Sequence, residues 1–156
     1  MQTANSYSGE NQPYLTFVRV DTLDALIFGC GRLAIMVLEY LQKQGCNVTV
    51  LDSEQNPLIE LEKKYTIQTI LIKDPVIQDY LQEANIRIAE MFFGLSRCDH
   101  TNILLSQIAK HLFNISTVIC HIEDPSLHDI YSQLGLKVVG KSDSQLYQKT
   151  IDLLEA

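Results

Sequence analysis

Residues 24–34 read DALIFGCGRLA, and this stretch contains the clearest structural signal of the 156-residue chain. An apolar run leads into a Gly-Cys-Gly-Arg turn, after which the chain returns to apolar residues. A structural turn needs one glycine at most, so two glycines one residue apart indicate that something approaches the backbone closely. Gly29, Gly31 and Ala34 fill the frame G-x-G-x-x-G/A, which is typical of a dinucleotide-binding turn between a strand and a helix.

Each residue of this frame has a distinct expected role. Gly29 would allow the tight turn, Gly31 would let a pyrophosphate approach the main chain, and Ala34 would keep the helix close to the sheet. The helix N-terminus would present free N–H groups and a partial positive charge to the phosphates. Arg32 in the first turn is unfavourable for the helix dipole, and a bound anion would offset that cost.

An acidic residue follows at the distance that this motif requires. The second apolar run, NVTVL, ends in Asp52, which lies 21 residues beyond Gly31. A carboxylate at that strand end can accept hydrogen bonds from a ribose diol, and it disfavours a 2′-phosphate, so NADP is the least expected ligand. The alternative interpretation is a turn that is merely tight, with Asp52 as a solvated strand end.

Short apolar runs alternate with segments of helical periodicity along the rest of the chain. The runs are ALIFG (25–29), VTVL (48–51), TILI (69–72), AEMFFGL (89–95), TVICHI (117–122) and KVVG (137–140). Runs that do not alternate in polarity are typical of strands buried on both faces of a parallel sheet. With right-handed crossovers, this order predicts the α/β class: a Rossmann-like, doubly wound parallel sheet in a single domain.

Helix boundaries are also marked in the sequence. The predicted N-caps, each followed by a proline, are Asn56, Asp74 and Asp124. Gly45 and Gly135 are predicted to end helices. The segment TNILLSQIAKHLF (101–113) is apolar enough to be a mostly buried helix, and DSQLYQKTIDLLEA (143–156) predicts a terminal helix.

The domain is expected to span residues 24–156, after a polar tail at residues 1–23. Within that tail YLTFVRV (14–20) is either an extra edge strand or a linker. The net charge of −7 argues against nucleic-acid binding, which needs a basic face. A signal peptide and a run of roughly 18–20 apolar residues are both missing, which favours a cytoplasmic chain without membrane insertion.

Neither a catalytic site nor a metal site is predicted. The four cysteines are scattered, which indicates reduced thiols rather than a zinc site, and the four histidines lack ligand spacing. The sequence Cys98-Asp99-His100 suggests a nucleophile and a base, but adjacent residues at a helix start point in different directions. The chain beyond the predicted sheet is too short for a substrate domain, so we expect a protein that is not an enzyme.

From Asp24 to about Ala156 the chain resembles the RCK N-terminal (TrkA-N) domains, which are cytoplasmic nucleotide-binding modules of potassium channels and transporters. The order and spacing of five blocks carry this resemblance. They are IFGCGRLA (27–34), VTVLDSEQNPLIELEKKY (48–65), LIKDPVIQDYLQEANI (71–86), FFGLSRCDHTNILLSQIAKHL (92–112) and VICHIEDPSLHDIYSQLGLKVV (118–139). The last three blocks favour this family over dehydrogenases.

The resemblance implies a set of nucleotide-binding positions: Gly29, Cys30, Gly31, Arg32, Leu33, Asp52, Ser53, Asp74 and Ser96. The first five would surround the phosphates, whereas Asp52 and Ser53 would meet the adenosine ribose. Asp74 would lie beside the adenine, and Ser96 would lie near the far end of the ligand. Asp99 and Asn102 match the polar start of the helix that follows.

Three positions depart from the family pattern. Lys73 replaces a glycine next to the expected adenine position, Val76 replaces a common threonine, and His121 stands where arginine is frequent. These departures imply an altered ligand preference or the loss of the ligand. Because the sequence ends at the terminal helix, the second regulatory (RCK-C) domain of many relatives is not expected here.

The resemblance therefore implies a cytoplasmic regulatory domain or subunit of a potassium transport system that senses NAD(H) or ATP, ADP or AMP. Ligand occupancy would favour one arrangement of a homodimer or larger ring, and that arrangement would bias a membrane channel or transporter subunit. Apolar faces of the 101–113 helix and the terminal helix would make the self-contacts. Two alternatives remain open: a small NAD-dependent oxidoreductase, and a degenerate Rossmann module, favoured by Lys73, that serves as an assembly surface.

Overall fold

The computed structural model of the chain describes residues 22–73, 77–140 and 146–155. Six strands form one sheet in which every neighbouring pair is parallel. They are β1 (Asp24–Phe28), β2 (Asn47–Asp52), β3 (Gln68–Leu71), β4 (Met91–Gly94), β5 (Thr117–His121) and β6 (Lys137–Val139). Their order, β3-β2-β1-β4-β5-β6, reverses direction between β1 and β4. This doubly wound sheet confirms the predicted fold class.

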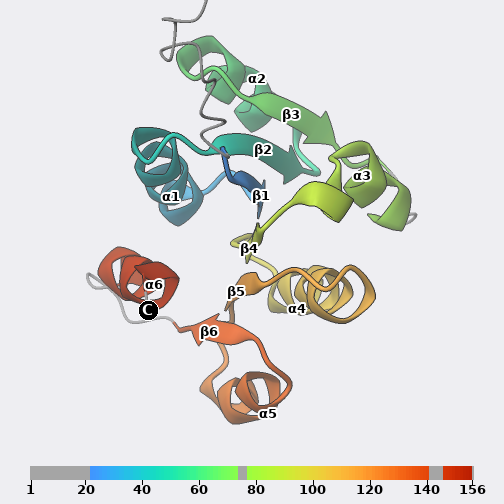
Figure 1. The fold of residues 1–156 in the computed structure, drawn as a ribbon, viewed down its shortest axis with the longest axis vertical. Coiled ribbons are helices and arrows are strands. Elements are labelled where there is room, and N and C mark those ends of the chain that lie inside the picture. Colours follow the sequence, from blue (N-terminus) through green and yellow to red (C-terminus); the bar gives the residue numbers. More distant parts are fainter. Residues whose placement is uncertain (1–21, 74–76, 141–145, 156) are drawn as a thin grey trace, which may run out of the picture.

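Helices cover both faces of the sheet (Figure 1). They are α1 (Arg32–Lys43), α2 (Gln55–Lys64), α3 (Ile77–Glu83), α4 (Asp99–Gln107), α5 (His128–Gln133) and α6 (Leu146–Glu155). Helices α1, α2 and α6 pack on one face, and α3, α4 and α5 pack on the other. Among the described residues, the longest of these helices has 12 residues, and no helix is long and apolar enough to cross a bilayer.

The strands are apolar at successive positions because both of their faces are buried. In β1, Ala25 and Ile27 pack with α1 and α2, whereas Leu26 and Phe28 pack with the helices of the opposite face. All four side chains are at most 6% exposed. Burial on both faces is the physical reason why the strand runs show no alternation in polarity.

The predicted helix ends after α1 and α5 are confirmed. Gly45 and Gly135 follow these helices with φ angles of +81° and +96°, in the left-handed region that glycine enters without a steric penalty. Asp124 is also confirmed as a cap, because its Oδ1 accepts a hydrogen bond from the backbone N–H of Ser126 at 2.9 Å. A short 3₁₀ turn, Pro125–Leu127, then leads into α5.

The N-cap prediction at Asn56 is wrong. Helix α2 begins two residues earlier than predicted, at Gln55 rather than at position 57, with Glu54 in the capping position and no side-chain cap. The cause lies at the end of β2, where Asp52 Oδ1 accepts a hydrogen bond from the Glu54 backbone N–H at 3.0 Å. This local turn starts the helix before the Asn-Pro pair is reached.

Helix α4 runs into a π-helical turn at Ile108–Leu112, so the predicted 101–113 helix is present with a wider last turn. One of its faces packs into the core, but Leu104 and Leu112 are 50% and 55% exposed. The expectation of a mostly buried helix therefore holds for one face only. Three expectations lie outside the described residues: the edge strand or linker at 14–20, most of the 1–23 tail and the Asp74 cap.

Candidate functional site

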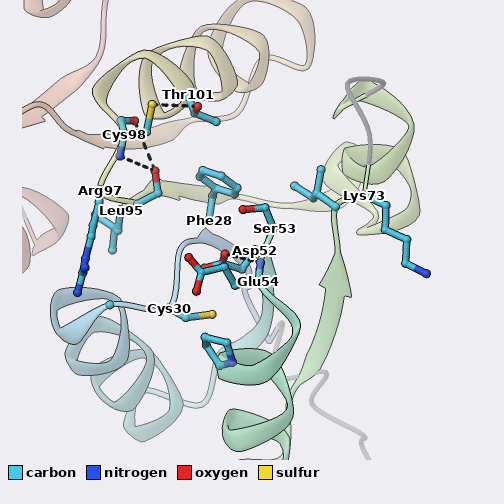
Figure 2. A pocket seen from close by; sticks show the side chains of 14 residues that line it. Phe28, Cys30, Asp52, Ser53, Glu54, Lys73, Leu95, Arg97, Cys98 and Thr101 are labelled. Atoms are coloured by element: carbon cyan, nitrogen blue, oxygen red, sulfur yellow. Dashed lines mark hydrogen bonds between the residues drawn. The ribbon is translucent and has the colours of Figure 1, made fainter.

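A cavity of about 560 Å³ opens at the carboxyl ends of β1, β2 and β4 (Figure 2). This is the point where the strand order reverses, and ligands of open parallel sheets bind in such crevices. The lining residues are Phe28, Cys30, Gly31, Asp52, Ser53, Glu54, Pro57, Ile72, Lys73, Leu95, Ser96, Arg97, Cys98 and Thr101.

The two glycines of the turn after β1 differ in their surroundings. Gly29 has φ +117°, and a Cβ added to it would lie 2.8 Å from both Leu95 C and Ser96 N. Only glycine therefore fits where the turn packs against the end of β4. A Cβ added to Gly31 would meet no atom within 4 Å. The main chain of Gly31 is thus bare on the side where an added side chain would project.

Helix α1 begins next to this bare main chain. Gly31 is its N-cap residue, and the first turn contains neither a side-chain cap nor an acidic residue. The N–H groups of that turn are therefore available to an external acceptor, and the helix dipole favours an anion there. The Arg32 side chain is exposed beside the cavity lining, and Leu33 packs against the core below α1.

The end of β2 supplies an acidic wall. Asp52 is half-buried and uses Oδ1 to hold the Glu54 backbone, while the side chains of Ser53 and Glu54 are exposed at the cavity. The Cys30 thiol lies beside Asp52. Burial and then the Asp52 carboxylate raise the pKa of Cys30 far above its ordinary value, so this thiol stays neutral.

The opposite wall is fixed by a buried asparagine. Asn102 is 0% exposed, and its Oδ1 accepts hydrogen bonds from Ser96 N at 2.9 Å and from Ser96 Oγ at 2.7 Å. Its Nδ2 donates to the carbonyl oxygens of Ser96 at 2.8 Å and His121 at 2.9 Å. Asn102 therefore locks the loop after β4 onto the end of β5.

A second polar side chain of α4, that of Asp99, holds the loop after β5 by hydrogen bonds. The carboxylate of Asp99 accepts backbone hydrogen bonds from Glu123 at 2.8 Å and from Asp124 at 3.0 Å. It thereby ties the start of α4 to the segment that follows β5. The family resemblance identified Asp99 and Asn102 only as a polar helix start, and the structure assigns both of them to loop positioning.

Cys98 is exposed at the cavity (Figure 2), and its backbone N–H donates a hydrogen bond to Ser96 Oγ at 3.2 Å. Its Sγ accepts a hydrogen bond from the Thr101 hydroxyl at 3.3 Å, and this bond is the main cause that lowers the pKa of Cys98. The neighbouring Asp99 is engaged with backbone N–H groups. Asp99 is therefore not positioned to orient a base for the thiol.

Lys73 does not fill the cavity. Its side chain is exposed, and Figure 2 shows its ammonium group directed away from the space between Asp52 and Cys98. The crevice therefore stays open, although a long side chain replaces the glycine of the family pattern. Arg97 lies on the opposite side of the same cavity.

Five of the residues proposed from the sequence line this one cavity: Cys30, Gly31, Asp52, Ser53 and Ser96. Gly29 lies beneath it, Arg32 and Leu33 lie in the adjoining helix turn, and Asp74 lies outside the described residues. Glu54, Arg97 and Thr101 also line the cavity, although no sequence motif marks them. Glu54 and Arg97 follow the ends of β2 and β4 by two and three residues, and this position was the available signal, whereas Thr101 lies in the first turn of α4.

The family model of the TrkA-N domain matches residues 25–141, which include all of the sheet except its first residue, Asp24, and the whole lining of the cavity. The chain belongs to the TrkA-N domain family. A curated relative of this TrkA-N domain is the "Trk system potassium uptake protein TrkA" of Streptomyces coelicolor. It is 30% identical over 73% of this chain and 51% of the relative. The chain spans about half the length of the first curated relatives that it matches.

Solved structures share the fold at lower identity. The TrkA-N domain of the inner membrane protein ybaL from Escherichia coli has a TM-score of 0.65 at 15% identity, covering 85% of this chain and 97% of that one. GsuK bound to ADP has a TM-score of 0.65 at 20% identity, covering 85% and 34%. The GsuK channel bound to NAD has a TM-score of 0.64 at 20% identity, covering 86% and 24%.

Proposed function

We propose that this TrkA-N domain binds NAD(H) or an adenine nucleotide (ATP, ADP or AMP) and is a non-catalytic regulatory domain or subunit of a potassium transport system. One observation carries the proposal. An open cavity joins the bare main chain of Gly31, at the start of α1, to the carboxylate of Asp52 at the end of β2. These are the two groups that a phosphate and a ribose diol require.

In the proposed complex, each chemical part of the nucleotide has its own residues. The phosphates lie against the turn formed by Gly29, Cys30, Gly31, Arg32 and Leu33. The adenosine ribose bonds to Asp52 and Ser53, the adenine lies towards Asp74, and the far end of the ligand reaches Ser96. The open space next to Gly31 and the acidic wall at Asp52 support this orientation.

The acidic wall also supports a selectivity. Asp52 and Glu54 both line the cavity. Their carboxylates can accept hydrogen bonds from the 2′-hydroxyl of NAD, but they would repel the negative charge of the 2′-phosphate of NADP. NADP is therefore expected to bind more weakly than NAD.

The regulatory role is supported by the names of the relatives, which include potassium uptake proteins and a potassium channel protein. The partner is a membrane potassium channel or transporter subunit, to which this domain attaches on the cytoplasmic side. The domain forms a homodimer or a larger ring through the exposed face of the 101–113 segment, where Leu104 and Leu112 are 50% and 55% exposed. The terminal helix α6, from which the sequence also predicted a self-contact, instead packs Leu153 and Leu154 against the core. A nucleotide that binds one arrangement of the assembly more tightly shifts the population towards it.

The alternative of a domain that has lost its ligand was favoured by Lys73. The outward direction of that side chain removes the steric argument for this alternative (Figure 2).

Thermal unfolding with and without nucleotides tests the proposal. A ligand at a hundred times its dissociation constant adds about 2.7 kcal/mol of stability, so at least one of NAD, NADH, ATP, ADP and AMP should raise the unfolding temperature. Gly31→Val and Asp52→Asn should abolish the shift, and Asp52→Asn still leaves an oxygen for the Glu54 N–H. Glu83→Gln removes a remote exposed carboxylate as the matched control. A wild-type protein that no nucleotide stabilises would refute nucleotide binding, and turnover of NADH would instead indicate an oxidoreductase.

A further inference from the structure

Arg97 is a positively charged residue of the cavity wall that belongs neither to the hydrophobic core nor to the glycine-rich motif. It follows the end of β4 by three residues, its side chain is exposed, and it lines the cavity together with Gly31. Among the described residues that line the cavity, the only other basic side chain is Lys73, whose ammonium group is directed away from the open space.

The backbone places Arg97 next to the glycine-rich turn. A Cβ on Gly29 would lie 2.8 Å from the backbone nitrogen of Ser96, so the turn and the end of β4 are in contact one residue before Arg97. Figure 2 shows the Arg97 side chain extending along the cavity towards the start of α1. Its guanidinium group is thus on the side of the cavity where the first helical turn presents its N–H groups.

In the part of the chain that the structure describes, the guanidinium of Arg97 has no acidic partner. Within residues 22–73, 77–140 and 146–155, no carboxylate forms an ion pair with Arg97, and no hydrogen bond engages its side chain. In a chain with a net charge of −7, an unpaired arginine beside a cavity is available to an anionic ligand. Its planar fork of N–H donors matches the oxygens of a phosphate group.

The charges of the cavity therefore differ from one end to the other. Asp52 and Glu54 form the acidic end, and the start of α1 together with Arg97 forms the electropositive end. The ribose diol of a nucleotide can donate hydrogen bonds to the carboxylates of the acidic end. The N–H groups at the start of α1 can bind one phosphate without any other group. A second phosphate adds negative charge, and a cation of the cavity wall, in addition to Arg32 in the first turn of α1, would stabilise it.

Building on the proposed nucleotide site, we propose that Arg97 binds the second phosphate of the ligand. The site then selects nucleotides that contain a pyrophosphate, such as ADP and NAD, over a nucleoside monophosphate such as AMP. Arg97 is in this account a specificity-determining residue, and the turn at Gly31 remains the site of the first phosphate.

Isothermal titration calorimetry with ADP, NAD and AMP tests this inference on the full chain. The wild-type protein should bind ADP and NAD about tenfold or more tightly than AMP, the effect of one charge-assisted hydrogen-bonding group. Arg97→Gln should reduce the affinity for ADP by about tenfold and leave that for AMP within about twofold. Arg97→Lys, which keeps the charge but not the fork, should retain part of the preference.

The ratio of ADP to AMP affinity within each variant is the deciding quantity, because it is insensitive to losses of folded protein. Lys64→Gln, at the exposed end of α2, removes one positive charge far from the cavity and should leave the ratio unchanged. If the ADP-to-AMP affinity ratio of the Arg97→Gln variant equals that of the wild-type protein, the inference about Arg97 is wrong, but nucleotide binding still stands. The same holds if the wild-type protein binds AMP as tightly as ADP. If the wild-type protein binds none of the three nucleotides, the proposed function is refuted as well.

Discussion

The side chain of Asn102 bonds to both ends of the Ser96 backbone: its Oδ1 accepts from the Ser96 N–H at 2.9 Å and its Nδ2 donates to the Ser96 carbonyl at 2.8 Å. The same Nδ2 donates to the carbonyl of His121 at 2.9 Å. Because Ser96 lines the cavity, a fully buried amide on α4 sets the position of one cavity wall. The shape of the site thus depends on a residue that does not line it.

Replacing this amide should cost stability. Asn102→Ala leaves the Ser96 N–H and the carbonyls of Ser96 and His121 without their partner in the interior, so we expect a loss of about 3 kcal/mol in the free energy of unfolding. Urea denaturation measures this loss. Asn47→Ala is the matched control, because the Asn47 amide is exposed, and it should cost less than about 1 kcal/mol. Equal effects of the two substitutions would contradict the proposed role of Asn102.

Alanine at the two glycines of the turn should have very different consequences. Gly29→Ala forces an alanine into φ +117° and against the backbone of residues 95 and 96, so it should destabilise the fold by about 2 kcal/mol or more. At Gly31 the added methyl group meets open space at an ordinary φ of −74°, so Gly31→Ala should cost only the lower preference of alanine for an N-cap, less than about 1 kcal/mol. Chemical denaturation of both variants checks this contrast, which a similar loss at both positions would refute.

The four thiols should differ in reactivity. Burial raises the pKa of Cys30 and Cys46 and raises that of Cys120 to about 11, whereas the Thr101 hydroxyl lowers the pKa of Cys98. Since the thiolate is the reactive form, iodoacetamide should alkylate Cys98 first, and its rate should rise with pH at lower values than for the other three.

The donor to Cys98 can be removed separately. Thr101→Val removes the hydroxyl that stabilises the thiolate, so the pKa of Cys98 should rise and its alkylation profile should move to higher pH. Thr101→Ser keeps a hydroxyl at this position and serves as the control. Mass spectrometry of the labelled peptides gives both profiles, and an unchanged profile for Thr101→Val would show that the hydrogen bond has no influence.

Self-association should depend on the exposed side of α4. Leu104 is 50% exposed, so Leu104→Lys should keep the fold within about 0.5 kcal/mol while it places a charge in the proposed contact between copies. Light scattering after size exclusion should show the wild-type chain as a dimer or larger ring and the variant as a smaller species. A monomeric wild-type protein would contradict the proposed assembly.

The fold was predictable because its signals are local. The strands of this parallel sheet are unbroken apolar runs, and glycines at positions 45 and 135 end helices in a conformation that few other residues adopt. The start of α2 was not predictable in the same way. The proline at position 57 suggested Asn56 as the cap, but the hydrogen bond from the Glu54 N–H to Asp52 starts the helix earlier.

The site was predictable in part for a related reason. Gly31 and Asp52 belong to a motif whose spacing is fixed by one strand-helix-strand unit. The role of Asn102 depends on the end of β5, which is 19 residues away along the chain, so no local pattern reports it. The direction of Lys73 depends on a rotamer that the sequence does not encode.

Chemical-shift mapping of the ¹⁵N-labelled chain with ADP tests the central claim most directly. If ADP binds in the proposed site, we expect the largest amide shifts at the turn after β1, around Gly31 and Arg32, with further shifts at Asp52 and Ser96. A second cavity, which Asn47, Thr66 and Asn85 line, opens at the amino ends of the strands and provides the contrast. Shifts confined to the amino ends of the strands, or no saturable shifts at all, would contradict nucleotide binding at the carboxyl ends of the strands.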